Sequence, residues 1–541
     1  MMPTVNVTGG WETVVEGTAR AELERAILPD YLRAQRWFGG KGRRIEALRF
    51  VDWGGLPGAE NRVFAVLLEV RFADDQSDLY FLPLGVSGGE SAARMMQSQQ
   101  AGPIARLIGP GGEAVLHDAL ADDDTCLSLV EAIGAKRDFA TKHGQIRAIP
   151  TAAFAPLAGG DVHSLPVERG PAKSSNSLIF YGRRLMLKLF RRLECGINPE
   201  FEMGRFLTEG RLFQRIPCVA GAIEHRRSGA ELITLAILQS FVVNQSDGWQ
   251  HALDHLGRYY ESVSSSDAAV PDRRSLLELT KSDPPRVAVE AIGGCLRAAG
   301  VLGRRTAEMH HALSAGSNNP AFASEPFTPR DADALRAGIR MRGESALAAL
   351  RNNLDQLPGD VASSARQLLD KAPDMLRQRE HGSPFRADAA KIRCHGDYHL
   401  GQVLRVEDDY VIIDFEGEPM RTVAERRAKQ SPLKDLAGML RSYHMAAYAG
   451  LFAFTQNQPE NFDRLRPKAE LWYQWVSAAF LRDYLSRANG AAFVPADTTA
   501  FAKLLEAFML EKMFYELHYE LNNRPDWVRI PLHHILTLVS P

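Results

Sequence analysis

An Asp and an amide stand five residues apart in the segment HGDYHLGQ, residues 395–402. Phosphoryl transfer needs a base to orient the attacking hydroxyl, oxygen ligands for a divalent cation, and a cation on the phosphates that stay behind. The spacing of Asp397 and Gln402 equals that between the catalytic Asp and the metal-binding Asn of phosphotransfer loops. We therefore predict that Asp397 is the base and that Gln402 is a metal ligand.

A second carboxylate follows a short apolar segment. The residues YVII, 410–413, have the composition of a strand, and Asp414 and Phe415 come directly after them. A strand end holds a side chain rigidly, and Mg²⁺ prefers hard oxygen ligands. The pattern predicts Asp414 as a Mg²⁺ ligand.

Lys188 lies in the middle of the apolar segment RLMLKLF, residues 184–190, which reads as a strand. A lone cation among apolar neighbours has no packing role there, so we predict that Lys188 contacts the α- and β-phosphates of a nucleotide. The alternative is a lysine whose stem lies along the surface with its ammonium in water. Glu202, on a helix expected over residues 199–210, is the first choice for an acid that orients Lys188. Glu200 and Glu209 are alternatives.

No glycine-rich phosphate-binding motif of the GxGxxG or GxxxxGK[ST] type precedes Lys188. A segment of small polar residues, KSSNS at 173–177, comes just before a strand pair instead. Backbone amides and hydroxyls of such a segment suit a phosphate, although the same composition is also typical of a plain turn. The predicted phosphate-binding residues are Ser174, Ser175, Asn176 and Ser177.

The two histidines of the HGDYH segment have the i, i+4 spacing of a zinc-protease pair. The Glu that such a pair requires after the first His is replaced by Gly396, a poor helix former, which argues against a zinc site. We expect His395 to organise the loop. His399 either contacts substrate or supports the loop.

The expected secondary structure changes along the chain. Short apolar strand-like segments dominate up to about residue 245, and long segments with three- and four-residue apolar spacing follow. A sheet-rich lobe before a helical lobe is the order expected of a kinase-like fold. We predict an α+β, bilobal, eukaryotic protein-kinase-like chain with three parts: a cap subdomain at 1–140, an N-lobe at 141–245 and a helical C-lobe at 246–541.

Composition narrows the function classes. The 541 residues include 64 Lys and Arg against 66 Asp and Glu, so the chain has no basic excess for nucleic acid or an anionic membrane surface. No apolar run approaches the roughly 18 residues needed to span a bilayer, and no signal peptide is apparent, so we expect a cytoplasmic protein. The cysteines are odd in number and form no CxxC pair, and we expect them to be buried thiols. They are Cys126, Cys195, Cys218, Cys295 and Cys394.

Several segments together resemble bacterial maltokinases and the kinase module fused to trehalose synthase. They are RWFGGKGR at 36–43, the run from SSNSLIFYG through LMLKLF to EFEMGRFL, HGDYHLGQVL, IIDFEGEP, SPLKDLAGMLRS and EKMFYELHYELNNRPDW. The resemblance implies a fold of the aminoglycoside-phosphotransferase kind behind a cap subdomain, with ATP and Mg²⁺ used to convert maltose to maltose 1-phosphate. It places the family's roles on Asp397, Gln402, Asp414 and Lys188. Gln402 matches that family, whereas the wider superfamily usually has Asn.

The acceptor residues are predicted from residue type alone. Polar groups and aromatic faces suit a sugar, and His399, Arg441, Tyr443 and Tyr519 are the chosen candidates. His444, Tyr515, Glu516 and Trp527 have suitable side chains as well. Aromatic residues at helical spacing, such as Tyr515 and Tyr519, are also typical of a core.

Two alternatives stay open. The first is a kinase of another small sugar, above all glucosamine, whose ammonium would pair with a carboxylate such as Glu416, Glu418 or Glu516. The second is a pseudokinase that binds nucleotide and regulates trehalose synthase, against which the intact Asp397 and Lys188 argue. Trehalose synthase is also the expected protein partner of an active enzyme.

Overall fold

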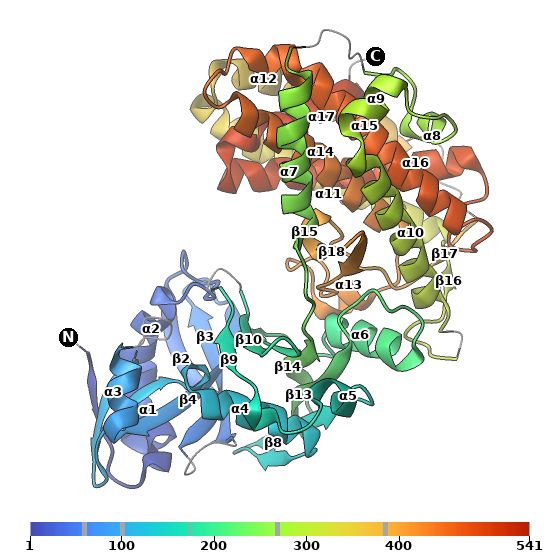
Figure 1. Ribbon diagram of the computed structural model, residues 1–541. Helices are drawn as coiled ribbons and strands as arrows, with labels where there is room; N and C mark the ends of the chain where they lie inside the picture. The colour runs from blue at the N-terminus through green and yellow to red at the C-terminus, as the bar shows by residue number, and fades with distance from the viewer. Residues whose placement is uncertain are drawn as a thin grey trace. The chain divides into compact units, whose positions relative to one another are not determined.

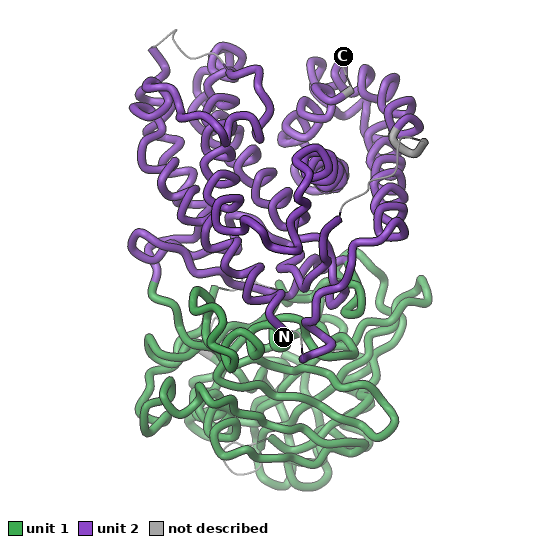
Figure 2. The backbone as a smooth tube through the Cα atoms, turned by 90° about the vertical axis from the view of Figure 1, so that its right-hand side faces the viewer, with its two compact units in different colours: residues 1–243, 421–425 green, residues 244–420, 426–541 purple. Residues whose placement is uncertain are grey.

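The computed structural model describes residues 2–56, 62–97, 103–171, 175–265, 271–316, 318–381 and 388–539. The chain forms two compact units, coloured separately in Figure 2. Unit 1 comprises residues 1–243 and 421–425, and unit 2 comprises 244–420 and 426–541.

The first sheet of unit 1 has seven strands within the described ranges, antiparallel except for the parallel pair β1 and β5. Its order is β1 (Thr4–Asn6), β5 (Ala105–Gly109), β6 (Gly112–Asp118), β4 (Ser77–Gly88), β3 (Val63–Phe72) and β2 (Ile45–Gly55), with β12 (Arg192–Leu193) paired to β4. The accompanying helices are η1 (Trp11–Val15), α1 (Gly17–Glu22), η2 (Leu23–Ile27), α2 (Leu28–Ala34) and α3 (Gly89–Gln97).

Strand β3 is apolar along almost its whole length because both of its faces are buried. Val63, Ala65 and Leu67 pack in one hydrophobic core, and the alternate residues, such as Phe64 and Val66, pack in another. Successive side chains of a strand point to opposite faces, so a strand between two cores needs a continuous apolar run. This sheet is therefore the shared wall of two cores.

The second sheet of unit 1 includes the strand that carries Lys188. Several strands of this sheet are labelled in Figure 1. Its order is β7 (Asp138–Ala140), β8 (Gly144–Pro150), β13 (Val219–Arg227), β14 (Ile233–Ser240), β11 (Leu185–Leu189), β10 (Ser177–Tyr181) and β9 (Val167–Arg169). The associated helices are η4 (Ala119–Ala121), α4 (Asp123–Gly134), α5 (Phe154–Ala158), η5 (Val162–Ser164) and α6 (Pro199–Gly210). In β11, Leu185, Leu187 and Leu189 face the core, and alternation places Lys188 on the opposite face.

Unit 2 is mainly helical, as its apolar spacing predicts. Its helices are α7 (Gly248–Val263), α8 (Leu276–Leu279), α9 (Arg286–Ile292), α10 (Gly294–Ser314), α11 (Pro329–Asn353), η6 (Leu354–Gln356), α12 (Gly359–His381), α14 (Leu433–Thr455), α15 (Asn461–Arg487), α16 (Thr498–Asn523), η8 (Pro525–Trp527) and α17 (Arg529–Val539). Nearly every residue of α14 is buried, as expected of a helix surrounded by others. In the part of the chain that the structure describes, no helix is both long and apolar enough to span a membrane.

Two helices of unit 2 approach each other closely at a glycine. A Cβ atom on Gly303 of α10 would lie only 2.1 Å from the carbonyl oxygen of Phe480 in α15. Any larger residue at 303 would therefore push these helices apart.

A small sheet interrupts the helices of unit 2 and carries the segments with predicted chemistry. Strands β15 (Ser246–Asp247), β18 (Val403–Val406) and β19 (Asp409–Ile412) form it, and η7 (Leu400–Gln402) precedes β18. A separate pair joins β16 (Glu325–Pro326) to β17 (Ala390–Lys391), and α13 (Val423–Arg427) follows β19 along the chain.

The cysteine prediction needs one correction. All five cysteines are free thiols, but Cys195 is exposed and Cys218 is only partly buried. Cys195 follows the two-residue strand β12, where the chain leaves the sheet, and this position gives it no core to enter.

Candidate active site

The loop that contains Asp397 is fixed to α14 by one buried carboxylate, that of Asp435. The backbone N–H groups of His395 and Gly396 donate to its two oxygens at 2.8 and 2.9 Å. The ring of His310 lies 3.1 Å from the same carboxylate. Burial acts to raise the pKa of Asp435, but His310 and the backbone donors outweigh it and hold the pKa below its usual value. The loop is thus held by an ionised group inside the helical core.

Asp397 sits between a lysine and a histidine. Lys512 Nζ donates to Asp397 Oδ1 at 3.1 Å, and His399 Nε2 lies 3.9 Å from Oδ2. Burial acts to raise the pKa of Asp397, yet Lys512 and then His399 lower it further than burial raises it. Asp397 is therefore ionised at neutral pH, the form in which it accepts a proton.

His399 acts on the loop as well as on Asp397. Its Nδ1 accepts a hydrogen bond from the backbone N–H of Gly401 at 3.1 Å, which caps the short helix η7. Burial lowers the pKa of His399. The structure therefore shows the supporting role for His399 and places its other ring nitrogen beside Asp397.

Gln402 and Asp414 meet at one end of the small sheet. Gln402 Nε2 donates to Asp414 Oδ2 at 2.9 Å, and the backbone N–H of Ile413 donates to the Gln402 carbonyl at 3.0 Å. Asp414 has a positive φ of 64°, a conformation that residues other than Gly, Asn and Asp rarely adopt. With its amide nitrogen turned to Asp414, Gln402 keeps its carbonyl oxygen for a cation. This pair of oxygen donors fits Mg²⁺.

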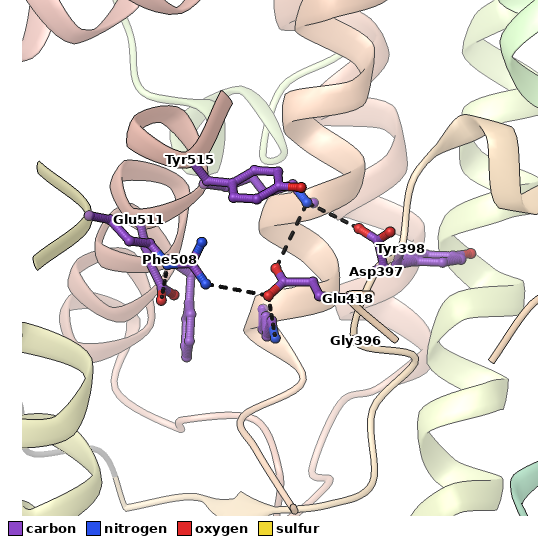
Figure 3. Close-up of a pocket in the computed structure, with 11 residues that line it drawn as sticks. Gly396, Asp397, Tyr398, Glu418, Phe508, Glu511 and Tyr515 are labelled. Carbon is purple, nitrogen blue, oxygen red and sulfur yellow. Dashed lines mark hydrogen bonds and ion pairs between the residues drawn. The ribbon is translucent and has the colours of Figure 1, made fainter. Parts of the chain in front are cut away.

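A pocket within unit 2 surrounds Asp397, and Figure 3 shows Asp397, Glu418 and Tyr515 turned toward the same space. Lys512 Nζ lies 4.0 Å from Glu418 Oε1, and Arg342 Nη2 lies 3.4 Å from Glu418 Oε2. The open cavity is about 20 Å³, enough for roughly one water molecule. The charged side chains beside Asp397 therefore neutralise one another.

Two tyrosines lie one turn apart on α16, and the first of them, Tyr515, lines this pocket. The rings of Tyr515 and Tyr519 stack, with centroids 6.3 Å apart and an interplanar angle of 22°. Lys512 Nζ lies 4.8 Å from the Tyr515 ring centre, and Tyr519 is 43% exposed. Tyr515 lines the pocket beside Asp397, and Tyr519 extends its aromatic surface toward solvent.

Two other residues predicted to contact the acceptor lie in the helical core of unit 2. Arg441 is fully buried, and its guanidinium donates to Glu516 Oε2 at 2.7 and 3.0 Å and contacts His534. Tyr443 is 4% exposed and packs edge-on against Trp472 and Phe480. Both lie on α14, which is enclosed by other helices, and residue type alone gives no indication of that enclosure.

In unit 1, Lys188 is paired with an acid on α6. Lys188 Nζ donates to Glu200 Oε2 at 2.8 Å, and Gln239 Nε2 donates to Glu200 Oε1 at 3.0 Å. Glu200 lies in the first turn of α6, where the helix dipole favours a carboxylate. Glu200 thus takes the place first predicted for Glu202: it is the buried acid of this turn, whereas Glu202 is only half-buried.

The predicted phosphate-binding segment is described in part. Ser174 lies outside the described residues. Ser175 and Asn176 lie in the bend before β10, and Ser177 begins that strand. Ser177 Oγ accepts a hydrogen bond from Arg191 Nε at 2.7 Å. The segment therefore enters the strand that pairs directly with β11, where Leu178 lies opposite Lys188.

The sequence reasoning missed Asp435 and Lys512. A signal existed for Lys512, because it stands in EKMFYELHYE, a segment already noted for its resemblance, one turn before Tyr515 and Glu516. An ionised Asp in a crowded pocket needs a cation, and this lysine is on the same helix face as those candidates.

Residues 31–122 match the family model described as the maltokinase N-terminal cap domain. A glucosamine kinase of Streptacidiphilus jiangxiensis is 25% identical over 305 residues, 56% of this chain. The aligned part spans 57% of that relative. A glucosamine kinase of Mycolicibacterium smegmatis is 25% identical over 372 residues, 66% of this chain and 75% of the relative.

Solved structures show the same fold. Glucosamine kinase in complex with glucosamine, ADP and inorganic phosphate matches with a TM-score of 0.56 and 20% identity, covering 91% of this chain and 94% of that one. A second crystal form of glucosamine kinase matches with a TM-score of 0.58 over 93% and 96% of the two chains. The predicted kinase-like fold with a sheet-rich part, a helical part and an N-terminal cap is confirmed. The chain is thus maltokinase-like in its N-terminal cap domain and has the fold of glucosamine kinase.

Proposed function

We propose that this protein is a kinase that moves the γ-phosphate of ATP to a hydroxyl group of a sugar. The observation that carries the proposal is the ionised Asp397 on a rigid loop, together with the paired oxygen donors Gln402 and Asp414. Their presence also argues against a pseudokinase. We further propose that residues 1–140 act as the cap, 141–245 as the N-lobe and 246–541 as the C-lobe.

In this proposal Asp397 accepts a hydrogen bond from the acceptor hydroxyl and takes its proton as the oxygen attacks the γ-phosphorus. Lys188, oriented by Glu200, contacts the phosphates that leave with ADP. The segment Ser175–Ser177 supplies small polar groups to the same phosphates. Gln402 and Asp414 would hold Mg²⁺, which when bound neutralises charge on the phosphate oxygens.

For the acceptor we propose maltose, phosphorylated at its anomeric hydroxyl. The relatives are named glucosamine kinases, but the pocket here already contains an ammonium, that of Lys512, between Asp397 and Glu418. Arg342 and Lys434 also face Glu418, at 3.4 and 3.9 Å. A second ammonium on the substrate would therefore meet like charge, whereas the hydroxyl groups of a neutral sugar can donate to Asp397 and Glu418 and accept from Lys512. Tyr515 and Tyr519 offer a surface for a second ring.

The cap match favours the same assignment, because its description names maltokinases. A maltokinase would work beside an enzyme that supplies maltose, and we propose trehalose synthase as that partner. Both would act in the cytoplasm, where ATP is available.

A panel of acceptor sugars tests this function. With saturating Mg-ATP, we expect kcat/KM for maltose to exceed that for glucose or glucosamine by well over 10-fold, because a monosaccharide leaves buried polar groups unpaired. Phosphorus NMR of the product should place the phosphate on the anomeric carbon. A kcat/KM for glucosamine equal to that for maltose would refute maltose as the acceptor and leave the kinase proposal standing. Absence of transfer to any sugar would refute both.

The Lys512→Met variant should shift the pH dependence of the reaction. In the wild type Lys512 lowers the pKa of Asp397, so the base stays ionised to pH values below its ordinary pKa. Removing this cation raises the pKa of Asp397 and moves the acid limb of the kcat/KM profile to higher pH. The profile from pH 4 to 8 measures the shift.

Lys434→Met is the matched control for this variant. Lys434 lies 3.9 Å from Glu418 in the same pocket but makes no ion pair with Asp397 among the described contacts. We expect the acid limb of its kcat/KM profile to coincide with that of the wild type. If the acid limb of the Lys512→Met profile also coincides with that of the wild type, the ionisation of Asp397 does not control the limb.

A further inference from the structure

The strand that carries Lys188 runs directly into the sheet of the cap. Residues Leu185–Leu189 form β11 of the second sheet, and after only two intervening residues Arg192 and Leu193 pair with Tyr80 and Leu79 of β4. The backbone N–H of Phe81 donates to the carbonyl of Arg191, between these two pairings, at 2.8 Å. One stretch of nine residues is therefore hydrogen-bonded to both sheets.

Arg191, at the junction, connects the cap to the start of β10. Its side chain is 3% exposed, and Nη2 donates to Asp118 Oδ2 of the cap at 2.5 Å. Nε of the same guanidinium donates to Ser177 Oγ at 2.7 Å. The guanidinium also lies over the ring of Trp37, 4.9 Å from its centre. A rigid, planar group with these partners fixes the position of Ser177 relative to the cap.

Asp118 is itself held in place. It ends β6 and is 4% exposed, and its Oδ1 accepts a hydrogen bond from the backbone N–H of Leu120 at 3.0 Å. Both Asp118 and Trp37 belong to the residues matched by the cap family model. The remaining donor of the guanidinium, Arg191 Nη1, is buried and has no hydrogen-bond partner in the described part of the chain. The two directed bonds of Arg191 to Asp118 and Ser177 therefore come from its Nη2 and Nε atoms alone.

We propose that Arg191 and Asp118 are positioning residues, through which the cap sets Ser177 and the Lys188 strand in place for the phosphates of ATP. This inference rests on the proposed kinase function. It assigns the cap a role in nucleotide affinity, because the Asp118–Arg191–Ser177 connection leads to the phosphate-binding segment and to the lysine strand. The acceptor pocket is built from unit 2 alone, so the acceptor should be unaffected.

The test compares Asp118→Asn with Asp78→Asn. Asn is isosteric with Asp but loses the charge that holds Arg191. We expect the Kd for Mg-ATP, measured by calorimetry, and the KM for ATP to rise about 10-fold, as for loss of a charge-assisted hydrogen bond. The KM for the acceptor sugar should stay within about 2-fold.

Asp78→Asn removes a different ion pair between the cap and β12. Asp78 Oδ1 accepts a hydrogen bond from Arg192 Nη2 at 2.7 Å. Arg192 directly follows Arg191 in the chain, but its ion pair with Asp78 does not involve Ser177. We expect ATP affinity to be unchanged in this control. An equal loss of ATP affinity in both variants would mean that any loosening of the cap has this effect, and would overturn the specific role of Arg191 and Asp118.

Arg191→Lys provides a second variant in case Asp118→Asn does not fold. Lysine keeps a positive charge for Asp118, but a single ammonium cannot reproduce the two directed bonds of the guanidinium. We expect the Kd for Mg-ATP to rise as much in Arg191→Lys as in Asp118→Asn, and the loss of thermal stability to be smaller. Wild-type ATP affinity in the folded variants would refute the inference while leaving the kinase proposal intact. A wild-type protein that binds no Mg-ATP would refute the kinase proposal itself.

Discussion

Replacing Asp397 with Asn is expected to lower kcat by at least about 10²-fold while the fold and nucleotide binding persist. An amide has nearly the shape of the carboxylate and still accepts a hydrogen bond from Lys512, so the pocket should keep its arrangement. It cannot accept the proton of the acceptor hydroxyl. The measurements are kcat at saturating ATP and sugar, and the Kd for Mg-ADP by calorimetry.

The matched control for this variant is Asp408→Asn. Asp408 lies in the turn between β18 and β19, is fully exposed and pairs with Arg405 at 2.9 Å. We expect no change in kcat, because the turn is away from the base and an exposed ion pair contributes little. Near-normal turnover in Asp397→Asn would remove Asp397 from the mechanism.

Replacing Asp414 should abolish tight binding of Mg-nucleotide. Asp414 is the carboxylate that we assign to the metal, next to the neutral amide of Gln402. Without it the cation loses its anionic protein ligand, and the nucleotide loses the cation that neutralises its phosphates. Calorimetric titration with Mg-ATP, and with ATP in the presence of EDTA, measures the metal-dependent part of the affinity.

Two substitutions at 414 separate charge from backbone strain. Asn tolerates the positive φ of 64° and removes only the charge, whereas Ala also strains the backbone by roughly 1–2 kcal/mol. We expect both Asp414→Asn and Asp414→Ala to lose metal-dependent binding, and only Ala to lose stability in urea unfolding. If Asp414→Asn binds Mg-ATP as the wild type does, the metal lies elsewhere.

The part of the site that the sequence made predictable is local. Asp397 and Gln402 share one loop, and Asp414 follows the next hairpin, so spacing and strand ends were enough to predict that Gln402 and Asp414 meet. The sequence also indicated that Lys188 lies outside the core, because an alternating strand places it on the face opposite three core leucines. The order of sheet-rich and helical regions followed from apolar periodicity in the same way.

The rest depends on contacts between distant residues. Lys512 is 115 residues from Asp397 in sequence, and no local pattern connects them. Choosing Glu200 over Glu202 requires the phase of a helix start to within one residue, which sequence patterns do not give. Arg441 and Tyr443 have the side chains of a sugar site but lie on a helix enclosed on every side, and enclosure is a property of the assembled bundle.

The alternation of β3 between two cores makes the cap inseparable from the rest of unit 1. Val63, Ala65 and Leu67 pack with residues of the second sheet, such as Ile179 and Leu187, while Phe64 and Val66 pack with the cap helices. Removing the cap would take β3 away from the core that contains the leucines of β11, and these leucines would become exposed to water. We therefore expect the two sheets to unfold as a single cooperative block, and we expect a chain without the cap to need a redesigned core.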